Sequence, residues 1–78
     1  MDLHQHREQL VKIDQHLDEC QRRVGDQALY VEQLDKGGQE TALAMRLLQA
    51  LEETLEQLRI RRQLILGTIT RKSTPPRA

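Results

Sequence analysis

Two apolar heptad repeats flank the pair Gly37-Gly38, and their mirror symmetry is the feature that most constrains the fold. The stripe before the glycines consists of Leu3, His6, Leu10, Ile13, Leu17, Cys20, Val24, Gln27, Val31 and Leu34. The stripe after them consists of Thr41, Ala44, Leu48, Leu51, Leu55, Leu58, Arg62, Ile65 and Ile69. A chain that reverses at the glycines brings the stripes into register, with Cys20 opposite Leu55 and Leu17 opposite Leu58. Sustained heptads are typical of helices packed along one seam. The pattern therefore predicts an all-α, coiled-coil-like antiparallel hairpin.

The hairpin is expected to occupy residues 1–70, with helices at 2–36 and 39–66 and a turn at 37–38. Gly37 should cap the first helix in the left-handed conformation, and Gly38 should complete the reversal. Gly25 weakens the first helix, but the heptad phase continues across it, so we expect one continuous helix. Gly67 should end the second helix, with residues 68–70 as either a frayed turn or an extension. The basic segment 71–78, which contains two prolines, is expected to be a disordered tail.

A lone pair of helices presents each seam to one neighbour and cannot enclose a core, so a chain of 78 residues needs a further source of stability. The second helix also carries apolar residues outside its seam. Both observations favour a homodimer in which two hairpins form a four-helix bundle. The alternative is that the same face captures a helix of another protein. The predicted dimer interface consists of Leu43, Leu47, Ile60 and Leu64.

Composition excludes several classes of function. Tyr30 is the only aromatic residue, which leaves no set of rings for stacking single-stranded bases and disfavours an aromatic ligand pocket. No stretch approaches the ~20 apolar residues of a membrane span, and the first residues lack the apolar run of a signal peptide. A single cysteine fits a reducing compartment. We expect a cytoplasmic protein with no membrane association.

Candidate chemistry is sparse. His16 and Cys20 lie four residues apart, and both residue types bind zinc. A cysteine in a heptad seam is more often a small core residue, so we expect no metal. No pairing of nucleophile and base and no phosphate-binding glycine loop is recognisable. The sequence therefore predicts a protein that is not an enzyme and has no cofactor.

Charge changes along the chain, because no acidic residue follows Glu56. One interpretation is that this basic end pairs with the acidic first half of helix one, which includes Asp2, Glu8, Asp14, Asp18 and Glu19. The other is a phosphate-binding surface, which would consist of Arg59, Arg61, Arg62, Arg71 and Lys72. We favour the first. Polar Gln27 and Arg62 within the seam are expected to fix the register.

The segment from Leu34 to Ala44, which reads LDKGGQETALA, continues through Leu47-Leu48 to a Leu-Glu-Glu-Thr-Leu stretch at 51–55. This string resembles short uncharacterised bacterial proteins in which a glycine turn and a Thr-x-x-Ala stretch precede a Leu-Leu…Glu-x-Thr-Leu helix. The likeness covers roughly residues 30 to 66. It implies a hairpin and a bacterial origin, and it implies no activity.

These observations lead to one expected function and one alternative. We expect a small non-catalytic protein that works through protein–protein interaction as an adaptor or regulator. The alternative is a hairpin dimer that binds nucleic acid through the basic end of the second helix.

Overall fold

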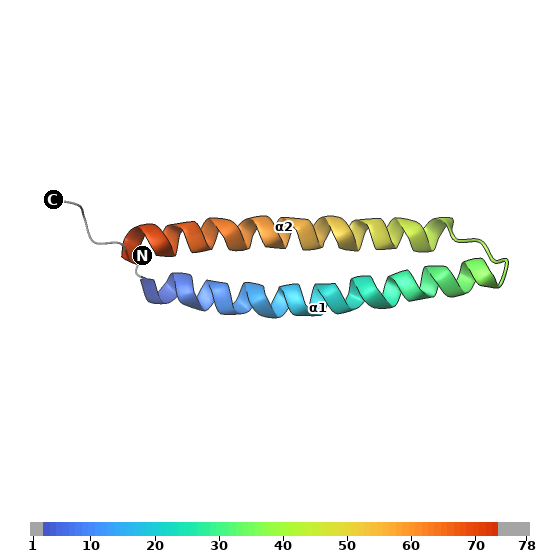
Figure 1. The fold of residues 1–78 in the computed structure, drawn as a ribbon, viewed down its shortest axis with the longest axis horizontal. Helices are drawn as coiled ribbons and strands as arrows, with labels where there is room; N and C mark the ends of the chain where they lie inside the picture. Colours follow the sequence, from blue (N-terminus) through green and yellow to red (C-terminus); the bar gives the residue numbers. More distant parts are fainter. Residues whose placement is uncertain (1–2, 74–78) are drawn as a thin grey trace.

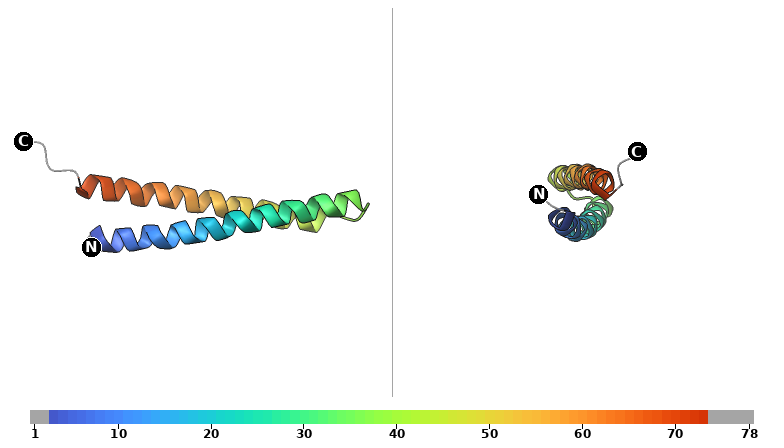
Figure 2. Two further views of the ribbon diagram at one scale, coloured as in Figure 1. Left: turned by 60° about the horizontal axis from the view of Figure 1, so that its bottom comes forward. Right: turned by 90° about the vertical axis from the view of Figure 1, so that its left-hand side faces the viewer.

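The structure is a computed structural model that describes residues 3–73 as two long helices and no strand. Helix α1 spans Leu3–Lys36 and helix α2 spans Ala42–Ser73. Figure 1 shows the two helices side by side and antiparallel, joined at one end of a rod that measures 66 × 18 × 15 Å. Figure 2 shows that they cross at a shallow angle. The predicted all-α antiparallel hairpin is confirmed.

Burial follows the two heptad stripes. Every described residue of α1 that is not exposed belongs to the first stripe, and His6, Ile13 and Cys20 are the buried members. Over residues 42–71, where burial in α2 is described, every member of the second stripe is at least half-buried, and only Leu66 and Thr68 join them. Within residues 3–73 no large side chain is completely enclosed. The core is therefore one seam deep, as expected for two helices with no third neighbour.

Two hydrogen bonds from α1 side chains to α2 carbonyls fix how the helices are aligned. The amide Nε2 of Gln27 donates to the Ala44 carbonyl at 2.9 Å, and the Cys20 thiol donates to the Leu51 carbonyl at 3.5 Å. One turn of an α-helix advances the chain by about four residues. The accepting carbonyls lie one turn before Leu48 and Leu55, which the predicted register places opposite Gln27 and Cys20, so both bonds agree with that register to within about one turn.

A third contact supports the same alignment from the far end of the rod. Arg62 Nε donates to Asp14 Oδ1 at 2.6 Å, so the guanidinium of a seam residue reaches across to α1. Gln27 and Arg62, the two residues expected to fix the register, thus both bond across the seam.

The reversal begins with a Schellman motif at the end of α1. Gly38 N–H donates to the Asp35 carbonyl at 3.0 Å, and Gln39 N–H donates to the Leu34 carbonyl at 2.9 Å. Gly38 has a φ of +71° and is the left-handed residue. The prediction that Gly37 would take this conformation is wrong, because Gly37 N–H still completes a helical bond to the Gln33 carbonyl at 3.1 Å.

Helix α2 begins at Ala42, three residues later than predicted, and the connection is 37–41 rather than 37–38. The reason is that Gln39 N–H is used to close α1. Glu40 then accepts a hydrogen bond from Ala42 N–H through its carboxylate at 3.3 Å, so its side chain caps the new helix from outside.

The predicted end of the second helix at Leu66 is also wrong, because α2 continues through Gly67 to Ser73. Half-buried Ile65 and Leu66 before the glycine and Thr68 and Ile69 after it continue the packing against α1, and this packing outweighs the cost of about 1 kcal/mol for a mid-helix glycine. Residues 71–73 of the predicted disordered tail are therefore helical, while 74–78 lie outside the described residues. In α1 the chain runs unbroken through Gly25, as predicted.

We expect Gly38→Ala to lower the free energy of unfolding by about 1–2 kcal/mol, because an L-residue pays this cost in the left-handed conformation. Gly37→Ala is the matched control. A Cβ at Gly37 comes no closer than 3.5 Å to another atom, and its φ is not positive. Urea unfolding followed by circular dichroism measures both. Equal stability of the two variants would contradict the assignment of the turn.

Candidate interaction face

Large apolar side chains remain exposed on both helices. The four residues predicted for a dimer interface are all among them, with exposed fractions of 78% for Leu43, 68% for Leu64 and 52% for Leu47 and Ile60. The others are Val11, Leu29, Tyr30 and Met45. Half of this exposed set thus belongs to the predicted interface.

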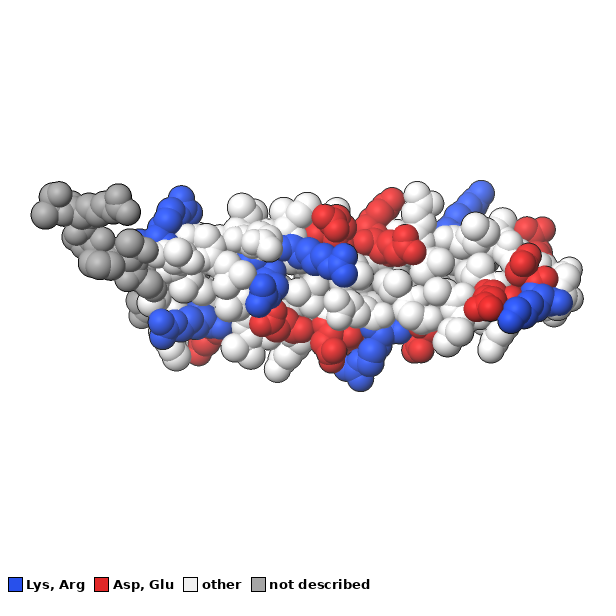
Figure 3. Space-filling view, in the orientation of Figure 1, with Lys and Arg blue, Asp and Glu red and all other residues white. Residues whose placement is uncertain are grey.

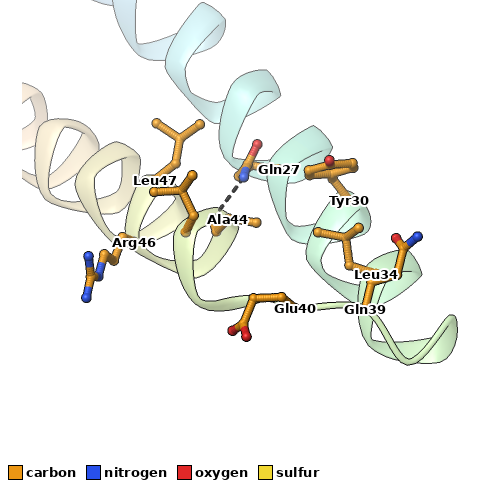
Figure 4. Close-up of a pocket in the computed structure, with 9 residues that line it drawn as sticks. Gln27, Tyr30, Leu34, Gln39, Glu40, Ala44, Arg46 and Leu47 are labelled. Atoms are coloured by element: carbon orange, nitrogen blue, oxygen red, sulfur yellow. Dashed lines mark hydrogen bonds between the residues drawn. The ribbon is translucent and has the colours of Figure 1, made fainter.

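An open groove of about 960 Å³ lies next to the interhelical turn. Figure 4 shows Tyr30 and Leu34 of α1 on one side of it and Ala44 and Leu47 of α2 on the other. The bond from Gln27 to the Ala44 carbonyl crosses between the helices here, so the amide nitrogen of Gln27 already has a partner. The groove therefore offers mainly apolar contact.

Two further grooves continue along the same side of the rod. The second shares Gln27, Tyr30 and Leu47 with the first, and the third shares Arg23 and Leu51 with the second. We call this side the groove face. Its exposed residues on α1 are His16, Glu19, Arg23, Asp26 and Tyr30, and those on α2 are Leu43, Arg46, Leu47 and Thr54. The face is thus charged along α1 and mainly apolar or uncharged along α2, with Arg46 as the exception.

The predicted interface residues divide into two pairs. Leu43 and Leu47 border the groove beside the turn, whereas Ile60 and Leu64 line none of these grooves. Leu64 follows Leu43 by three heptads and so lies on the same side of α2, roughly 30 Å further along it. The four residues therefore form two apolar patches on one helix rather than a single surface.

Tyr30 belongs to the groove face but was not predicted. It directly precedes the seam residue Val31, and the mirrored register brings it close to Leu47. Its position beside the seam could thus have identified it, although the residues that precede it at heptad spacing, Arg23, His16 and Gln9, are polar and give no periodic apolar signal.

Ion pairs run mostly within each helix. Glu8 pairs with His4, Asp18 with Arg22 and Glu19 with Arg23, all four residues apart. Among the described residues, Asp14–Arg62 is the one pair that crosses between helices. Of the four described acidic residues in the predicted pairing, only Asp14 meets the basic end of α2, and Asp2 lies outside the described residues. Figure 3 shows both signs of charge interspersed with uncharged surface.

The predicted phosphate-binding residues do not share a surface. Arg62 bonds to Asp14, Arg59 lies 4.0 Å from Glu56, and Arg71 donates to the Thr68 hydroxyl at 3.4 Å. Steps of about 100° per residue point Arg59, Arg61 and Arg71 in three different directions around α2. The Lys72 side chain lies outside the part of the chain whose side chains are described.

His16 and Cys20, the possible zinc ligands, differ in their exposure to solvent. The Cys20 side chain is buried with its thiol directed at the Leu51 carbonyl, whereas His16 is exposed. Over residues 3–73, no three His, Cys, Asp or Glu side chains are grouped as metal ligands. Neither α1 nor α2, as described, is apolar enough over a sufficient length to cross a bilayer.

Comparisons with protein-family models, with curated proteins and with solved structures found no match to this chain.

We expect a double-mutant cycle with Asp14→Asn and Arg62→Gln to give a coupling of about 0.5–1 kcal/mol at low salt, because both side chains are partly exposed. The coupling should fall towards zero in 1 M salt, where the Debye length is about 3 Å. The measurement is urea unfolding of the four proteins at both salt concentrations. Zero coupling at low salt would contradict a role for this pair in holding the helices in register.

Proposed function

We propose that this protein is a non-catalytic adaptor or regulator that works through protein–protein interaction, and that its working form is a homodimeric four-helix bundle. The observation that carries the proposal is the amount of surface left exposed. The chain of 9.1 kDa exposes 6336 Å², whereas a compact monomer of this mass exposes about 4,900 Å².

The excess of about 1,400 Å² per chain can be compared with known interfaces, which bury about 800 Å² on each partner. A rod of two helices is the source of this excess, since neither helix has more than one neighbour. Pairing with a second rod gives each helix another neighbour and removes surface of this order. The excess therefore supports an assembly rather than an isolated hairpin.

The exposed side chains support the same proposal. Leu43 and Leu64 have exposed fractions of 78% and 68%, whereas the seam residue Leu55 is buried. Leu43 and Leu64 lie outside the seam on the same side of α2, and exposed apolar side chains of this kind are stabilised by contact with another helix.

We expect wild-type protein to sediment as a dimer and Leu47→Asp to sediment as a monomer. Burying an unpaired carboxylate costs about 3 kcal/mol or more, which corresponds to at least a hundredfold weaker association. The control is Gln49→Asp, which places the same charge at an exposed position outside the grooves of the groove face.

Analytical ultracentrifugation over a concentration series distinguishes the variants, and circular dichroism checks that both remain helical. A wild type that is monomeric at all concentrations, yet unfolds cooperatively, would overturn the proposed homodimer.

A further inference from the structure

We infer that the occupant of the groove face is a second copy of this chain, placed antiparallel with its two-fold axis at the level of Gln21 and Thr54. This inference rests on the proposed homodimer and specifies its geometry. It follows from two patterns, one of charge on α1 and one of apolar residues on α2, that are symmetric about the same level of the rod.

Charge on α1 is self-complementary about Gln21. The groove face presents His16, Glu19, Arg23 and Asp26 along α1. In an antiparallel pair of identical helices, residues equally far on either side of the axis meet. An axis at Gln21 therefore sets Glu19 against Arg23 of the second copy and His16 against Asp26, and each contact occurs twice.

The same axis extends this pattern by one further contact. Lys12 lies one heptad before Glu19 and so shares its side of α1, and reflection about Gln21 brings it to Tyr30 of the second copy. An ammonium beside an aromatic ring is a favourable contact. No two like charges among these side chains meet directly across this axis.

Apolar residues on α2 are symmetric about a point between Glu53 and Thr54. Leu43 and Leu64 are equally distant from that point and lie on the same side of α2. Antiparallel packing of α2 on its copy thus brings Leu43 of one chain onto Leu64 of the other, twice. Leu47 and Ile60 are also equally distant from the point, but steps of about 100° per residue place Ile60 on a different side of α2 from Leu47, so Ile60 lies at the edge of this contact.

Residues near the axis allow the helices to approach closely. Ala50 is small, and the Thr54 hydroxyl donates to the Ala50 carbonyl at 3.0 Å. The hydrogen-bond donor of Thr54 is thus already satisfied within its own helix, and no buried polar group is left unpaired where the two copies of α2 are nearest.

The two axes coincide, although they come from different residues on different helices. Cys20 and Arg23 of α1 line the third groove together with Thr54 of α2, and the Asp14–Arg62 pair follows the same mirrored alignment, so Gln21 lies close to the level of Thr54 in the hairpin. A two-fold dimer requires one axis for both helices. Two unrelated surface patterns would have no reason to share that level.

The test is disulfide cross-linking in a Cys20→Ala background. Thr54→Cys lies next to the axis and should form a disulfide with its own copy under mild oxidation. Glu52→Cys is the matched control, because it is exposed at nearly the same height but on the opposite side of α2 and should remain reduced.

A second experiment tests the antiparallel direction. Leu43→Cys and Leu64→Cys should each fail to cross-link alone, since each residue then lies roughly 30 Å from its own copy along the axis. A co-refolded equimolar mixture of the two should cross-link. Cross-linking is read on non-reducing gels, and circular dichroism confirms that each variant is helical.

The outcomes separate this inference from the proposed homodimer. Sedimentation as a dimer with cross-links at Thr54→Cys and in the mixture supports both. A dimer that cross-links through Glu52→Cys, or in which Leu43→Cys alone cross-links, overturns the axis while the homodimer stands. A monomeric wild type overturns both.

Discussion

The structure depends on one row of contacts between two helices. Because α1 and α2 have no third neighbour among residues 3–73, each can bury only the stripe that faces the other. In this setting the polar members of the stripes are not isolated in an apolar core. Gln27, Cys20 and Arg62 each reach a partner on the opposite helix. These directional bonds distinguish one register from another, which a row of interchangeable leucines does less well.

Because the register is fixed, the residues exposed on one helix can be related to those exposed on the other. Two carbonyl bonds in the middle of the rod and an ion pair towards its open end are all compatible with the same mirrored alignment. The positions on the two helices can therefore be compared residue by residue. Without that agreement, the symmetry of charge on α1 and of apolar residues on α2 would be two separate observations. With it, they become one geometrical constraint on the proposed dimer.

Sequence alone was sufficient for the seam, because heptad spacing follows directly from helical geometry and every half-buried residue of α1 belongs to the predicted stripe. The ends of the helices were harder to predict from the sequence. Gly67 lowers the helix propensity of α2, but the packing of side chains that follow it offsets this cost. The N–H group of Gln39 bonds to the end of α1, so α2 begins only after this residue. Both outcomes depend on contacts that local propensity does not include.

The ion pairs show a similar limit of sequence reasoning. Asp18 and Glu19 were expected to meet the basic end of α2, but each has an arginine one turn away on its own helix. A partner at i+4 is held close by the helix itself, whereas a partner on the other helix must be reached by ordering two long side chains. Pairing within one helix is therefore favoured unless the seam already brings the charged groups of the two helices together, as it does for Asp14 and Arg62.

The division of the groove face between its two helices bears on what kind of partner it fits. A partner that offered only apolar surface would cover Leu43 and Leu47 but would leave Glu19 and Arg23 without new contacts. One that offered only charge would leave the leucines in water. The proposed occupant must present an apolar helix and a helix of alternating charge, side by side and at the spacing of this hairpin. A second copy of the chain meets all these conditions, since the register that aligns α1 with α2 in one molecule aligns them in the other.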